Sequence, residues 1–71
     1  MREFMKIEAN GGYIKLDSLL KLAGIAMTGG QAKMMIQSGD VYVNGERCLM
    51  RGKKMRAGDK AQFEDEIVEV I

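Results

Sequence analysis

The first apolar pattern in the chain predicts a short helix. Four side chains recur at intervals of three and four residues and so fall on one helical face: Leu16, Leu19, Leu20 and Ala23. Asp17 suits the first turn, because a carboxylate interacts favourably with the positive end of a helix, and Gly24 follows as a typical terminator. The sequence therefore predicts a helix over roughly residues 16–23.

A second helix is expected after a short connection. Thr28 and Gln31 have the spacing of a capping box, in which the Thr28 hydroxyl accepts from the Gln31 amide while the Gln31 side chain reaches back. Ala32, Met35 and Ile36 then share one face of the helix. Because the connection is so short, we expect the two helices to pack at an angle. The side chains expected at this contact are Leu19, Leu20, Ala32 and Ile36.

The next segments alternate as β-strands do. Gly39 stands where a helix C-terminus favours a left-handed residue, and Val41 and Val43 then flank Tyr42 with a period of two. Asn44-Gly45 separates this run from residues 46–48 and is the strongest short-range signal for a tight hairpin. The helix and the hairpin should form one rigid unit.

Two further strands are predicted towards the C-terminus. Ala57-Gly58-Asp59 supplies a turn before a strand at residues 61–63, and Asp65-Glu66 is the turn expected before a last strand at 67–70. Apolar side chains among the charges of residues 1–8 favour an additional N-terminal strand. The predicted fold class is α+β, with two packed short helices followed by a small antiparallel sheet of about four strands and this optional extra strand.

The length of 71 residues leaves room for one domain, which we assign to residues 1–71. No apolar run reaches the length of a membrane span, the N-terminus lacks a secretory signal, and the one cysteine cannot form an internal disulfide. The expectation is a cytoplasmic protein with no membrane partner.

Charge is unevenly distributed along the chain. The formal net charge is only +1, and residues 1–46 balance five basic against five acidic residues. Residues 47–60, which we call the basic segment, carry six basic residues and only Asp59 on the acidic side, a net +5, whereas the last eleven residues sum to −4. A basic run of this kind is often no more than a solvated face, but its imbalance also fits a polyanionic partner.

Catalytic chemistry has little support in the sequence. The chain has no histidine, and Cys48 has neither a second cysteine for metal binding nor a histidine to activate it, so its place in a predicted strand favours a buried packing thiol. Gly29-Gly30 lacks the Lys-Ser/Thr of a nucleotide-binding loop, and the acidic residues 64–66 read as a solvated turn. We expect no enzyme activity, metal, cofactor or small-molecule substrate.

The order of these features resembles a known family, the α-L RNA-binding domain named after the fourth protein of the small ribosomal subunit. The residues that carry the resemblance are Lys15-Leu16-Asp17, Leu20, Gly24, Ala32, Ile36, Gly39, Val41, Val43-Asn44-Gly45 and Gly58-Asp59. They span about residues 13–64, and the chain looks like the stand-alone YaaA/YbcJ-like small proteins. The resemblance implies binding of structured ribosomal or transfer RNA, with the ribosome or an assembly intermediate as a partner.

One departure from the family pattern lies at the start of the second helix, where Thr28-Gly29-Gly30 replaces the Ser-Arg-Arg that the family commonly carries. Two expected phosphate contacts are therefore missing. The glycines either let an RNA phosphate approach the helix N-terminal amides directly or serve only as a flexible lead-in with weaker binding.

The residues expected to contact RNA are Lys15, Gly29, Gly30, Lys33, Arg47, Arg51, Lys53, Lys54 and Arg56. Lys33 is turned about 100° from Ala32, off the apolar stripe. Tyr42 is either an ordinary surface tyrosine or a side chain that stacks on a base. The alternative function is a protein-interaction adaptor that uses the acidic C-terminal segment or the methionines, although core filling and edge positions are the simpler reading of Met27, Met34, Met35, Met50 and Met55.

Overall fold

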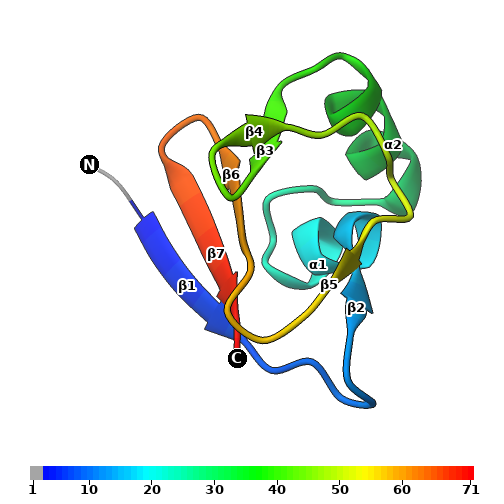
Figure 1. Cartoon of the computed structure of the whole chain (residues 1–71). Coiled ribbons are helices and arrows are strands. Elements are labelled where there is room, and N and C mark those ends of the chain that lie inside the picture. The colour runs from blue at the N-terminus through cyan, green and yellow to red at the C-terminus, as the bar shows by residue number, and fades with distance from the viewer. Residues whose placement is uncertain (1–2) are drawn as a thin grey trace.

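The computed structural model describes residues 3–71, so the predicted N-terminal strand segment is described without Met1 and Arg2. Within this range the chain forms two helices and seven strands (Figure 1). In chain order they are β1 (Glu3–Ile7), β2 (Ile14–Lys15), α1 (Leu16–Leu22), α2 (Gly29–Gln37), β3 (Val41–Val43), β4 (Glu46–Arg47), β5 (Lys54–Met55), β6 (Lys60–Phe63) and β7 (Glu66–Val70).

Both helices lie where the sequence predicts them. Ala23 is the C-cap of α1, and Gly24 follows with φ of 76°, in the left-handed region that glycine tolerates. Thr28 caps α2, and its Oγ1 accepts from the amide of Gln31 at 3.0 Å. The Gln31 Oε1 in turn accepts from the amide of Met27 at 2.8 Å, one residue before the position that the usual capping box reaches.

The helices and the sheet share one core. Leu19, Leu20, Ala32 and Ile36 are fully buried, as predicted, and join a cluster that includes Val41, Val68 and Val70 from the sheet. Figure 1 shows both helices on the same face of the five-stranded sheet. The opposite face of the sheet carries exposed side chains such as Phe4 and Tyr42.

The main sheet has the strand order β1-β7-β6-β3-β4. Its inner pairs are antiparallel, whereas β1 pairs with β7 in parallel, with Met5 opposite Val68 and Ile7 opposite Val70. The α+β prediction and its extra N-terminal strand are confirmed, and the sheet is mixed because β1 joins it in parallel. Two parallel strands need a long connection, and here the helices and the other strands lie between β1 and β7 in the chain.

The predicted hairpin between β3 and β4 is confirmed. Asn44 and Gly45 both have positive φ, 52° and 86°, as a type I′ turn requires. The last turn lies one residue earlier than predicted, at Glu64 and Asp65. Glu64 takes φ of 55°, and Glu66 already pairs with Phe63 as the first residue of β7.

Candidate functional site

A two-stranded antiparallel ladder, which the sequence analysis did not predict, brings two predicted RNA-contacting residues together. Strand β2 pairs with β5 so that Ile14 lies opposite Met55 and Lys15 opposite Lys54. Met55 is fully buried and Ile14 packs against the core. Because side chains alternate across a strand, Lys15 and Lys54 project from the outer face of the ladder.

Main-chain hydrogen bonds continue from this ladder to the start of α1. The amide of Leu16 donates to the carbonyl of Lys53 at 2.9 Å, and the amide of Asp17 donates to the carbonyl of Arg51 at 3.1 Å. Two amides at the N-terminus of α1, which have no partner within the helix, are thereby satisfied by the basic segment. The backbone of the basic segment is held against β2 and α1 by these bonds while its cationic side chains stay exposed.

We use the name basic surface for five exposed cationic side chains that lie on the ladder or next to it in the chain, and on the stretch of the basic segment bonded to α1. They are Lys15, Arg51, Lys53, Lys54 and Arg56.

Asp59, the one acidic residue of the basic segment, fixes the turn that follows this surface. Its Oδ2 accepts from the amide of Arg56 at 2.8 Å, and its Oδ1 accepts from Asn44 Nδ2 at 3.1 Å. The hydrogen bond from the Arg56 backbone has the largest effect and lowers the pKa of Asp59, and the bond from Asn44 lowers it further. The positive charges of nearby Lys53 and Arg56 also lower this pKa. Asn44 Oδ1 also accepts from the amide of Lys60 at 3.0 Å, so the hairpin turn and the basic segment are joined.

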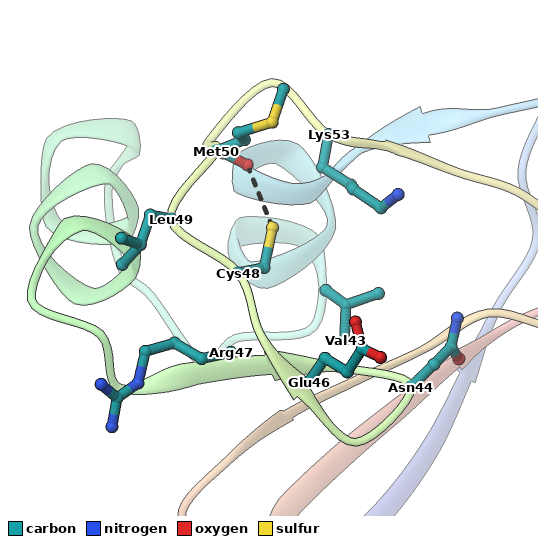
Figure 2. A pocket seen from close by; sticks show the side chains of 8 residues that line it. All are labelled: Val43, Asn44, Glu46, Arg47, Cys48, Leu49, Met50 and Lys53. Carbon is teal, nitrogen blue, oxygen red and sulfur yellow. Dashed lines mark hydrogen bonds between the residues drawn. The ribbon is translucent and has the colours of Figure 1, made fainter.

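Arg47 belongs to β4 and is not part of the β2–β5 ladder. Its guanidinium stands 5.8 Å from the ring centroid of Tyr42, and its Nη2 donates to the Tyr42 hydroxyl at 3.3 Å, a hydrogen bond that raises the pKa of Arg47. Its side chain also passes close to Gly39, where a Cβ would come within 3.3 Å of the Arg47 Cδ. Figure 2 shows the guanidinium of Arg47 pointing away from Lys53.

The remaining predicted residues lie on α2. A Cβ at Gly29 would have no neighbouring heavy atom within 4 Å, and one at Gly30 would meet only the Thr28 Oγ1 at 3.9 Å. Neither glycine has a positive φ, so neither packing nor backbone geometry requires glycine there. Lys33 is exposed one helical turn further on, off the apolar stripe as predicted.

Comparison with known proteins identifies the family. Residues 6–71 match the model of the S4 domain. This chain belongs to the S4 domain family. Its fold resembles the solution structure of YbcJ from E. coli, a protein described as having an alfaL motif involved in RNA-binding. The TM-score is 0.67 at 30% sequence identity, over 100% of this chain and 89% of that chain. A curated relative, named probable ribosome maturation protein RlbA from Bacillus subtilis (strain 168), is 39% identical over 51 residues, which is 72% of each protein.

The S4 domain also has an open hollow of about 460 Å³ beside the basic surface (Figure 2). It is lined by Val43, Asn44, Glu46, Arg47, Cys48, Leu49, Met50 and Lys53. Strand β4 ends at Arg47, so the prediction that Cys48 lies in a strand and is buried is wrong. Cys48 follows β4, is half-buried, and its thiol lies 3.7 Å from the carbonyl oxygen of Met50.

Across residues 3–71, no group of three or more His, Cys, Asp or Glu side chains is placed to hold a metal ion. Neither helix in this part of the chain has the length and apolar character needed to cross a membrane.

Proposed function

We propose that this S4 domain is a non-catalytic module that binds structured RNA through the basic surface. The observation that carries the proposal is the geometry of the β2–β5 ladder, which aligns Lys15 with Lys54 and holds the carbonyls of Arg51 and Lys53 against α1. Because the backbone is already fixed, only side-chain freedom is lost when the cations meet phosphates. The proposed cytoplasmic location and the single-domain assignment of residues 1–71 stay predictions.

The protein would recognise the shape and the phosphates of the RNA backbone and not its base sequence. The basic surface consists of lysine and arginine side chains, which can bind phosphates without distinguishing one base sequence from another. Double-stranded RNA is bound mostly in this way, through its A-form shape, its phosphates and its 2′-hydroxyl groups. Gly29, Gly30 and Lys33 would add a second group of phosphate contacts at the N-terminus of α2, and Arg47 would be a flanking contact.

The names of the relatives support ribosomal RNA as the partner. The alfaL motif of YbcJ is described as involved in RNA-binding, and RlbA is named a probable ribosome maturation protein. We therefore propose a ribosomal particle or assembly intermediate as the first place to look, with transfer RNA as the other structured candidate.

The experiment is a binding panel of ribosomal RNA fragments, transfer RNA and duplex DNA, titrated between about 50 and 300 mM salt. If four or five cations each neutralise one phosphate, log Kd should rise with log salt with a slope of roughly 3 to 4.5. Tight, salt-sensitive binding that favours RNA over duplex DNA is the expected result. Absence of RNA binding at the lowest salt would contradict the proposal.

The adaptor alternative has one observation in its favour. Met27, Met34 and Met50 are exposed by 83%, 70% and 67%, more than a core-filling role explains, whereas Met55 is fully buried. Exposed methionines suit protein contacts, because the side chain is flexible and polarisable. A protein partner that is retained when RNA binding is absent would favour this second function.

A further inference from the structure

Tyr13 is an exposed aromatic side chain at the basic surface, and the sequence analysis did not single it out. It precedes β2 directly and is 38% exposed. The Nζ of Lys54 lies 5.0 Å from its ring centroid. Lys15, two residues after Tyr13, stands opposite Lys54 on the ladder.

The Tyr13 ring lies next to a cationic stretch of the ladder. Lys54 lies over the ring, Lys15 is the cross-strand partner of Lys54, and Arg56 follows Met55 at the end of β5, so three cationic residues belong to the short segments beside Tyr13. An exposed lysine over a tyrosine ring is only weakly held. A phosphate that binds the Lys54 ammonium would therefore draw it from the ring and leave an aromatic face beside the nucleic-acid backbone.

We propose that Tyr13 stacks on one unpaired base, and that the RNA bound at the basic surface carries an unpaired nucleotide next to a duplex. The inference rests on the proposed function and narrows its substrate. The duplex supplies the phosphates that the cations contact. The base must be unpaired, because bases within an A-form helix are stacked on one another and present no free face to a protein.

Tyr42 offers a matched comparison. It is 37% exposed and also has a cation over its ring, Arg47 at 5.8 Å. However, its hydroxyl already accepts a hydrogen bond from Arg47, and it lies on the open face of the five-stranded sheet and not on the ladder. Tyr13 is the tyrosine that directly precedes the ladder and has a cation of the basic surface, Lys54, over its ring.

The test compares two RNA hairpins that differ only in a single bulged nucleotide, with wild-type protein and the variants Tyr13→Leu, Tyr13→Phe and Tyr42→Leu. Stacking of one base on an aromatic ring corresponds to roughly 5- to 150-fold in affinity. The wild type, Tyr13→Phe and Tyr42→Leu should prefer the bulged hairpin by a factor in this range. Tyr13→Leu should lose the preference and keep the affinity for the uninterrupted hairpin. A bulged 2-aminopurine should be quenched only by proteins with an aromatic residue at position 13.

Several outcomes overturn the inference. Equal binding of the two hairpins by the wild type, or a preference that survives Tyr13→Leu, would refute stacking by Tyr13 and leave the proposed function intact. An equal loss of affinity for both hairpins in Tyr13→Leu would assign Tyr13 a structural role. If the wild type binds neither hairpin at low salt, the proposed function itself fails.

Discussion

Replacing Asn44 should test how the hairpin and the basic segment are held together. The Asn44 side chain makes two hydrogen bonds, from its Nδ2 to Asp59 Oδ1 at 3.1 Å and from the Lys60 amide to its Oδ1 at 3.0 Å. Each is worth about 0.5–1.5 kcal/mol net, so their loss should cost about 1–3 kcal/mol. Asn44→Ala adds strain at φ of 52°, roughly 1 kcal/mol more, because alanine adopts the left-handed conformation less readily than asparagine.

The pair Asn44→Gly and Asn44→Ala separates these two contributions. Both variants lose the side-chain hydrogen bonds, but glycine adopts the left-handed conformation without steric cost. Asn44→Gly should therefore lose about 1–3 kcal/mol in the free energy of unfolding and Asn44→Ala about 2–4 kcal/mol. In a domain of this size each kcal/mol lowers Tm by about 4–8 °C.

The assay is urea unfolding of the wild type and both variants, with thermal melts as a second measurement. The m-value should stay constant, because the surface exposed on unfolding is unchanged. If both variants unfold within about 0.5 kcal/mol of the wild type, below the contribution of even one hydrogen bond, water replaces these bonds and the reasoning is refuted.

Two further predictions address the glycines and Asp59. In Gly29→Ala/Gly30→Ala, stability should rise by up to about 1 kcal/mol per residue because alanine favours helix, while RNA affinity should fall if phosphates approach the helix amides. An unchanged RNA affinity in a binding titration would mean that these glycines are only a flexible segment at the start of α2. For Asp59, the folded pKa is lowered, so its charge contributes stability that is fully present above the unfolded pKa of about 3.9 and is lost as pH falls through the folded pKa. Urea unfolding between about pH 7 and pH 2.5 should show Asp59→Asn less stable at neutral pH, with the difference shrinking in acid, and a constant difference would contradict this.

Local signals in the sequence were enough to predict the helices and the central hairpin. The Thr28 cap, the glycines after each helix and Asn44-Gly45 act within a few residues, so their meaning does not depend on the rest of the fold. The last turn lies one residue before the predicted position because Glu64 adopts a positive φ. Glutamate rarely takes this conformation, so the sequence did not indicate it.

Long-range pairings were not predictable in the same way. Strands β2 and β5 have two residues each and lie about forty positions apart, so neither carries a periodic pattern of its own. The parallel edge strand β1 likewise depends on β7 at the other end of the chain.

The sequence predicted only part of the candidate site. The run of charge in residues 47–60 was evident in the sequence. That Lys15 would lie opposite Lys54, and that Tyr13 would lie under the Lys54 ammonium, depended on the β2–β5 ladder. The fold separates Arg47 from the ladder by pairing it with Tyr42. Contact between RNA and any of these residues stays a prediction.

The most direct test of the central claim is RNA binding by Lys53→Glu/Lys54→Glu, compared with the control Lys6→Glu/Lys21→Glu. Both variants change net charge by the same amount at exposed lysines, but only the first changes the basic surface. The account predicts that Lys53→Glu/Lys54→Glu loses at least about tenfold in affinity for structured RNA and lowers the salt slope by about 1.5, with a much smaller effect in the control. Equal losses in the two variants, or wild-type affinity in the first, would contradict the account.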